Sequence, residues 1–124
     1  MSAYTDRVSD WCRPHEGLSY VTLAPLRWEV GAKGSGLWVE VPVGVVFDVS
    51  VPRLFRWLFS PRDWRYLAAA CLHDWTLGAT PDGRGLGWDR WTAAAIFQGA
   101  LAADGVGPVE RWVMTQAVIL GRRV

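Results

Sequence analysis

An adjacent histidine and aspartate, His73 and Asp74, are the residues of this chain best suited by type and position to carry out chemistry. An imidazole titrates near neutral pH and can act as a general base, and a neighbouring carboxylate can position water or a metal ion. The pair follows residues 67–72, whose leucine and alanine content favours a helix. We therefore take His73 and Asp74 as the candidate catalytic residues, with His73 as general base.

The same pair also has a structural interpretation. On a helix, successive side chains diverge by about 100°, so His73 and Asp74 would not readily hydrogen-bond each other. His73 would then be a satisfied core histidine, and Asp74 would brace a neighbouring loop. One helix face should hold the residues at i, i+4, i+7 and i+11, namely Tyr66, Ala70, His73 and Leu77. On either interpretation we expect His73 to be mostly buried.

Metal-assisted hydrolysis is a further possibility for these residues. The dipeptide is similar to the helix-borne His-Asp of secreted and viral phospholipases A2, which implies a histidine that activates water and an aspartate that binds calcium. Asp74 and Asp48, with Asp82 in the glycine-rich segment 78–87, could supply the oxygen ligands of such a cation. The chain would then be a small hydrolase of lipid or cell wall.

The two cysteines, Cys12 and Cys71, have several possible roles. They could form one disulfide, although nothing in a chain without a signal peptide requires it. With His15 and His73 they could in principle bind zinc, but the spacings are not those of a known zinc finger. We expect buried thiols and no bound cofactor.

Length and composition favour one compact domain spanning residues 1–124. The chain is 51% hydrophobic and 20% charged, as in globular proteins. A net charge of +1 gives no electrostatic reason to expect nucleic acid or an anionic membrane as a partner. We predict no transmembrane segment and no signal peptide, and we expect folding in a cytoplasm.

Nine tryptophans are unusually many for 124 residues. A small core cannot bury all of them and also satisfy every indole N–H, so some should lie at a surface that contacts another protein. The remainder would fill the core between helices. The candidates for the exposed interface are Trp11, Trp28, Trp38 and Trp88.

The pattern of the chain changes from strand-like to helix-like near residue 50. Strands are predicted at 19–23, 27–30, 37–41 and 45–49, with a hairpin loop at 31–36. Helices are predicted at 53–59, 63–77, 90–103 and 108–120, from Asp89 as a cap and from glycine and proline boundaries. The predicted fold is α+β, with a small antiparallel sheet packed against three to four helices.

Asp48 and Ser50 are predicted to form a turn that caps the helix beginning near Pro52. The turn would lie at the end of the sheet, where the helices start. Polar residues often converge at such a position, so we expect this turn to be close to His73.

Four segments together form a recognisable signature. They are Phe47-Asp48-Val49-Ser50-Val51-Pro52-Arg53, Ala69-Ala70-Cys71-Leu72-His73-Asp74-Trp75, Arg90 to Phe97 with Leu101, and Gly105-Val106. In order and spacing they resemble the phage and bacterial family catalogued as domain of unknown function 1353, over about residues 27–121. The resemblance implies a tailed-phage or prophage origin and carries no established activity.

The chain departs from this family at two places. Relatives usually have a tyrosine after the His-Asp and an aspartate in the third helix, where this chain has Trp75-Thr76-Leu77 and Ala93-Ala94. If that aspartate orients the histidine in relatives, its absence here removes a partner that general-base catalysis needs. Only Asp82 or Asp89 could replace it.

These observations favour a virion component at the tail tip or baseplate, acting by protein–protein interaction. Its partners would be other phage structural proteins or a second copy of itself, and it would be found in the virion or the host cytoplasm. The alternative is the small hydrolase described above, with calcium or zinc as its metal.

Overall fold

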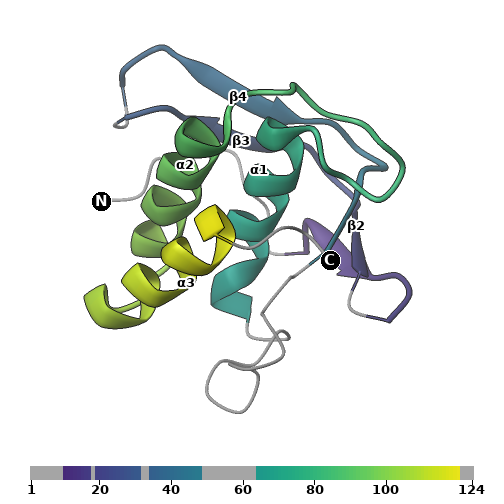
Figure 1. Ribbon diagram of the computed structural model, residues 1–124. Helices are drawn as coiled ribbons and strands as arrows, with labels where there is room; N and C mark the ends of the chain where they lie inside the picture. The colour runs from purple at the N-terminus through teal and green to yellow at the C-terminus, as the bar shows by residue number, and fades with distance from the viewer. Residues whose placement is uncertain (1–9, 18, 32–33, 49–63, 121–124) are drawn as a thin grey trace.

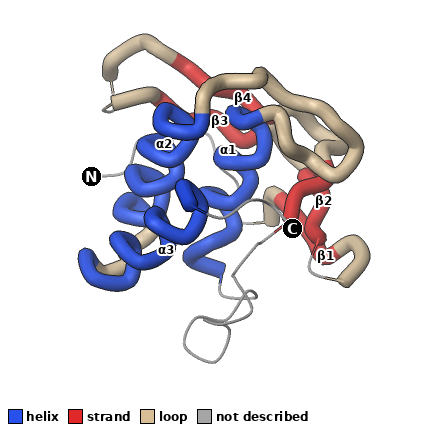
Figure 2. The backbone as a smooth tube through the Cα atoms, in the orientation of Figure 1, coloured by secondary structure: helices blue, strands red, loops and turns tan. Residues whose placement is uncertain are grey.

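The computed structural model describes residues 10–17, 19–31, 34–48 and 64–120, and it has an α+β fold (Figure 1). Short strands occupy the N-terminal half and helices the C-terminal half, as predicted (Figure 2). The strands are β1 Cys12–Pro14, β2 Ser19–Thr22, β3 Leu26–Glu29, β4 Trp38–Val41 and β5 Val46–Asp48. The 3-10 helix η2 Trp64–Tyr66 leads into α1 Leu67–Leu77, and α2 Arg90–Ala103 and α3 Pro108–Leu120 follow.

The strands form two small antiparallel sheets instead of the single sheet that was predicted. One sheet has the order β1-β2-β5, and the other is the hairpin of β3 and β4. In β4, Val39 and Val41 are buried while Trp38 and Glu40 point outward, so alternation along the strand separates core from solvent. Every strand predicted within the described residues is present, and β1 is an additional strand.

The helix boundaries follow the capping residues. The Asp89 carboxylate accepts hydrogen bonds from the Thr92 hydroxyl and from the backbone amides of Thr92 and Trp91, and these bonds, the hydroxyl first among them, lower the pKa of Asp89. Gly78 ends α1 in a left-handed conformation, with φ of 78°. The predicted helix 53–59 and the predicted cap at Ser50 lie outside the described residues.

The core is centred on α1, which lies beside α2 (Figure 1) and also packs against β5. Most of α1 is buried, including every residue from Ala68 to Asp74. Alanines make up much of this helix and of the inward face of α2, so the two helices can approach closely. Among the described residues, no helix has both the length and the apolar character needed to cross a membrane.

Candidate functional site

His73 lies in the core of the molecule. It is only 6% exposed, and its ring packs edge-on against Phe97 of α2, with ring centroids 5.4 Å apart. Tyr66 and Ala70 are buried with it and Leu77 is half-buried, so the predicted shared face is confirmed as an inward one. A general base must reach the proton that it removes from a substrate. A ring packed between α1 and α2 is better placed to fill the core.

Asp74 links α1 to the strands. The residue is 2% exposed, and its Oδ2 accepts a hydrogen bond of 2.9 Å from the Asp48 backbone amide of β5. Asp48 in turn accepts a hydrogen bond of 2.6 Å at Oδ1 from the Ser19 hydroxyl of β2. A chain of hydrogen bonds therefore runs from α1 through β5 to β2.

The structure thus brings two of the sequence motifs into contact. Asp48 is hydrogen-bonded to Asp74, the residue that follows His73. The Cα atoms of consecutive residues such as His73 and Asp74 are only about 3.8 Å apart. Asp48 of the predicted turn therefore lies close to His73 as expected, while Ser50, the other residue of that turn, lies outside the described residues. The contact uses the backbone amide of Asp48 and the carboxylate of Asp74, which is the geometry of a structural brace.

Cys71 adds a third ionisable group beside this pair. It is fully buried, and desolvation raises its pKa well above the ordinary value of 9.0, with further upward contributions from the charge of Asp74 and from Cys12. A thiol with a raised pKa stays protonated and is a poor nucleophile or metal ligand. Cys12 and Cys71 are not joined in a disulfide, and Cys12 is half-buried where we expected it to be buried.

The metal sites considered from the sequence are not assembled. Across the described ranges, no three His, Cys, Asp or Glu side chains are grouped in a way that could hold a metal ion. Asp82, expected to join Asp48 and Asp74, is exposed in the loop after α1 and accepts a hydrogen bond from the Thr80 hydroxyl. The prediction that Asp48, Asp74 and Asp82 together form a cation site is therefore wrong, because a local turn holds Asp82 at the surface while Asp74 is buried.

Asp82 and Asp89, the two possible replacements for the aspartate that relatives carry in the third helix, do not act on His73. Asp82 accepts the Thr80 hydroxyl, and Asp89 caps α2. The position that carries alanine here, Ala94, is itself buried at 2% exposure. Each of the two carboxylates therefore has a local structural role.

Two of the four tryptophans expected at an interface are in the core, so the expectation is wrong for Trp11 and Trp28. Trp11 is 6% exposed and stacks on Phe47, with ring centroids 5.7 Å apart. Trp28 is 5% exposed and packs on Gly99 of α2, where an added Cβ would stand 3.4 Å from the indole. Each indole is buried because a residue far away in the sequence, Phe47 for Trp11 and Gly99 for Trp28, packs against it.

Among the described residues, four other tryptophans do reach the surface. Trp38 and Trp88 are 39% and 37% exposed, and the sequence-based choice missed Trp91 and Trp112, which are 65% and 60% exposed. Helical phase could have identified Trp91, because it lies about 100° around α2 from the apolar face that contains Phe97 and Leu101.

The loop between α1 and α2, residues 78–89, is held firmly against the end of α1. Gly85 sits so close that an added Cβ would meet the Trp75 carbonyl oxygen and would stand 2.6 Å from the Gly78 Cα. The backbone amides of Leu86 and Trp88 donate to carbonyl oxygens of α1, at 2.8 and 2.7 Å. We call residues 78–89 the glycine-rich loop.

This loop presents apolar side chains to solvent. Residues 81–92 are all exposed, and among them Leu86 is 45% exposed, in addition to Trp88 and Trp91. The Arg84 guanidinium lies over the Trp75 ring at 5.7 Å from its centroid, and the Thr80 hydroxyl accepts from the Arg84 amide at 2.6 Å. The loop therefore combines a well-bonded backbone with an apolar, aromatic outer surface.

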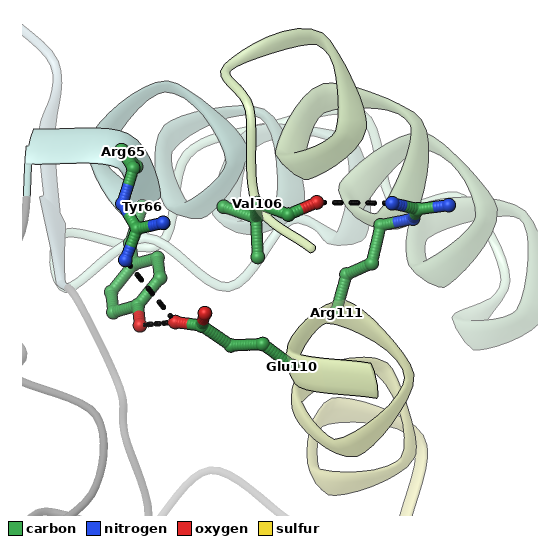
Figure 3. Close-up of polar contacts among 5 residues, drawn as sticks. All are labelled: Arg65, Tyr66, Val106, Glu110 and Arg111. Atoms are coloured by element: carbon green, nitrogen blue, oxygen red, sulfur yellow. Dashed lines mark hydrogen bonds and ion pairs between the residues drawn. The ribbon is translucent and has the colours of Figure 1, made fainter. Parts of the chain in front are cut away.

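The charged residues at the start of α3 make contacts within the molecule (Figure 3). The Glu110 carboxylate accepts hydrogen bonds from the Tyr66 hydroxyl and, at 3.4 Å, from Arg65. Arg111 donates to the Val106 carbonyl at 3.0 Å. Their neighbours Val109 and Trp112 remain 77% and 60% exposed. The start of α3 is thus a second surface with exposed apolar side chains.

Comparison with known proteins gave one family. The family model described as "Protein of unknown function (DUF1353)" matches residues 23–118. No curated protein and no solved structure matches the chain.

Proposed function

We propose that this chain, which belongs to the DUF1353 family, acts by binding other proteins during the assembly of a tailed-phage or prophage virion, at the tail tip or baseplate. Its partners are other structural proteins of the particle or a second copy of the chain. The observation that carries the binding role is the exposed apolar surface of the glycine-rich loop. The phage setting rests on the family resemblance.

Binding through the glycine-rich loop has a favourable energy balance. Large apolar side chains in contact with water gain free energy when a partner covers them, and tryptophan is among the residues that contribute most at interfaces. Because the loop backbone is hydrogen-bonded to α1 and packed at Gly85, little conformational entropy remains to be lost on binding. Leu86 and Trp88 are therefore the expected anchor residues.

The His-Asp pair supports this choice over hydrolysis. His73 is packed against Phe97, and the carboxylate of Asp74 binds the Asp48 amide. Both contacts lie within the fold. Asp74 then holds α1 against β5, His73 packs α1 against α2, and this arrangement supports the surface from which the glycine-rich loop projects.

The test is whether the protein sediments with particles from the cells that encode it. We expect wild-type protein in the particle fraction, and we expect Trp88→Ala with Leu86→Ser to lower the bound fraction at least tenfold, because each anchor contributes on the order of 2 kcal/mol. Leu23→Ser is the matched control, since Leu23 is 46% exposed and Leu86 45%. This control should bind as wild type does.

The opposite result would establish the hydrolase. Wild-type protein would stay free in the lysate, and purified protein would cleave phospholipid or peptidoglycan in the presence of calcium or zinc. That activity would be lost on His73→Ala, while circular dichroism showed an intact fold.

A further inference from the structure

Strand β4 has an edge that carries open backbone hydrogen-bonding groups. The Val30 amide donates to the Leu37 carbonyl at the end of the β3–β4 hairpin, and hydrogen-bonded positions alternate along an antiparallel pair. Val39 therefore bonds to β3, and the amides and carbonyl groups of Trp38 and Glu40 point away from it. Within the described residues, no group forms a hydrogen bond with these outward amides and carbonyls.

The outer strands of the other sheet are blocked at the comparable positions. β1 ends in Pro14, which has no amide proton to donate. On β5, the outward amide of Asp48 is bonded to Asp74 of α1. An open edge is a template on which another strand can add. Because its donors and acceptors have the spacing of a strand, the edge of β4 matches an extended polypeptide segment.

The open groups of β4 are arranged symmetrically about Val39. They belong to the residue before it and the residue after it. If two β4 strands lie antiparallel with Val39 at a two-fold axis, Trp38 of each strand lies opposite Glu40 of the other. Each such pair exchanges two hydrogen bonds, so every outward amide at these positions gains an acceptor. Pairing of a surface with itself is the usual geometry of two-fold dimers.

The side chains fit the same register. Glu40, the charged residue of β4, would lie opposite a tryptophan and not opposite another carboxylate, and Arg27 already lies 3.4 Å from it. On the core side of the strand, Val39 would face its own copy. Leu37 is 65% exposed and would lie opposite Val41 of the second copy. Apolar cross-strand pairs stabilise a sheet, so this register covers a leucine that the monomer leaves in water.

We propose that two copies of this chain join through β4, antiparallel about a two-fold axis at Val39, so that two hairpins form one four-stranded sheet. A second copy is favoured over a strand of another protein by the symmetry of the open groups, by the absence of like charges in opposite positions, and by the apolar partner that Leu37 gains. The interface uses β4 and not the glycine-rich loop, so the inference goes beyond the proposed function. Dimer formation needs no particle, and the two proposals can therefore fail separately.

The first test is sedimentation velocity of purified wild-type protein from about 1 to 300 μM, a range that suits a small interface. We expect a monomer–dimer equilibrium. Glu40→Pro should abolish the dimer, because it removes an outward amide, and proline is tolerated where the N–H of an edge strand faces solvent. Glu40→Ala is the matched control, because it removes the carboxylate and keeps the amide, and it should dimerise as wild type does.

A second pair of variants tests the apolar contact. Leu37→Ser should weaken the dimer about tenfold, because the dimer covers this side chain. Val109→Ser is the matched control, since Val109 is 77% exposed on α3, and it should leave the dimer unchanged. Circular dichroism checks that every variant remains folded.

Hydrogen exchange followed by NMR locates the interface in the wild-type protein. Above the dissociation constant of the dimer, the Trp38 and Glu40 amides should exchange at least about tenfold more slowly than below it. The amide of Asp82, which is exposed in the glycine-rich loop, should exchange at the same rate at both concentrations. This measurement decides the question even if Glu40→Pro fails to fold.

Three results would overturn the proposal. A wild-type monomer throughout the concentration range would exclude a second copy as the occupant of the edge. A dimer that tolerates Glu40→Pro, or in which the exchange of the Trp38 and Glu40 amides does not depend on concentration, would move the interface to another surface. Equal sensitivity to Leu37→Ser and Val109→Ser would exclude the register centred on Val39.

Discussion

Removal of the Asp74 carboxylate should destabilise the fold substantially. Asp74→Ala deletes the acceptor of the part-buried hydrogen bond from the Asp48 amide, together with a carboxylate that is 2% exposed. A buried hydrogen bond to a charged group contributes about 1.5–3 kcal/mol, and an orphaned buried donor adds a penalty of similar size. We therefore expect the free energy of unfolding to fall by about 3 kcal/mol.

Urea unfolding followed by tryptophan fluorescence measures this loss, because several indoles are buried in the native core. Asp74→Asn keeps an oxygen acceptor and should cost about half as much as Asp74→Ala. Asp48→Ala keeps the backbone amide that binds Asp74 and removes the acceptor for the Ser19 hydroxyl, so its cost should be about 1 kcal/mol.

Asp82→Ala is the control for loss of an exposed carboxylate, and it should change stability by less than about 0.5 kcal/mol. An Asp74→Ala variant as stable as the Asp82→Ala variant would refute the reasoning. The buried carboxylate would then not be holding β5 in solution, and a catalytic interpretation of the His-Asp pair would regain support.

Two further predictions concern other buried contacts. Because the pKa of Cys71 is raised in the folded protein, the neutral thiol contributes stability that is present below the ordinary thiol pKa and is lost as the pH rises past it. Urea unfolding of wild type and Cys71→Ala between about pH 8 and 11 should therefore show a less steep loss of stability for the variant, and parallel curves would contradict this. In thermal unfolding, Gly85→Ala should destabilise the protein by at least about 2 kcal/mol more than Gly83→Ala. Both glycines have positive φ, but only a Cβ at Gly85 would collide with α1, so equal losses would show that the loop backbone adjusts.

Local signals in the sequence were sufficient to predict α2 and α3, whereas the helix predicted at 63–77 begins with the 3-10 helix η2 and becomes α1 at Leu67. A capping aspartate at residue 89 and a proline at 108 mark the starts of α2 and α3, and both helices begin where predicted. β1 was missed because its three residues include Pro14 and have no strand pattern of their own. It forms by pairing with β2, which is a tertiary interaction.

The surface was harder to predict than the fold. Trp11 and Trp28 resemble the exposed tryptophans in local sequence, and their burial depends on Phe47 and Gly99, which are far away along the chain. Sequence reasoning did place Asp48 near the His-Asp pair, but not the atoms involved. That Asp74 binds the Asp48 backbone amide follows only from the packing of β5 on α1.

The hydrogen bonds of the glycine-rich loop also have a consequence for local unfolding. The amides of Leu86 and Trp88 are bonded to the carbonyl oxygens of Trp75 and Thr76, which belong to the last turns of α1. These amides can exchange with solvent deuterium only when the loop detaches from α1 or that end of the helix opens. Because attachment of the loop stabilises the C-terminal turns of α1, the two segments are coupled in local unfolding. A partner that binds the loop would slow hydrogen exchange inside α1, beyond the residues that it touches.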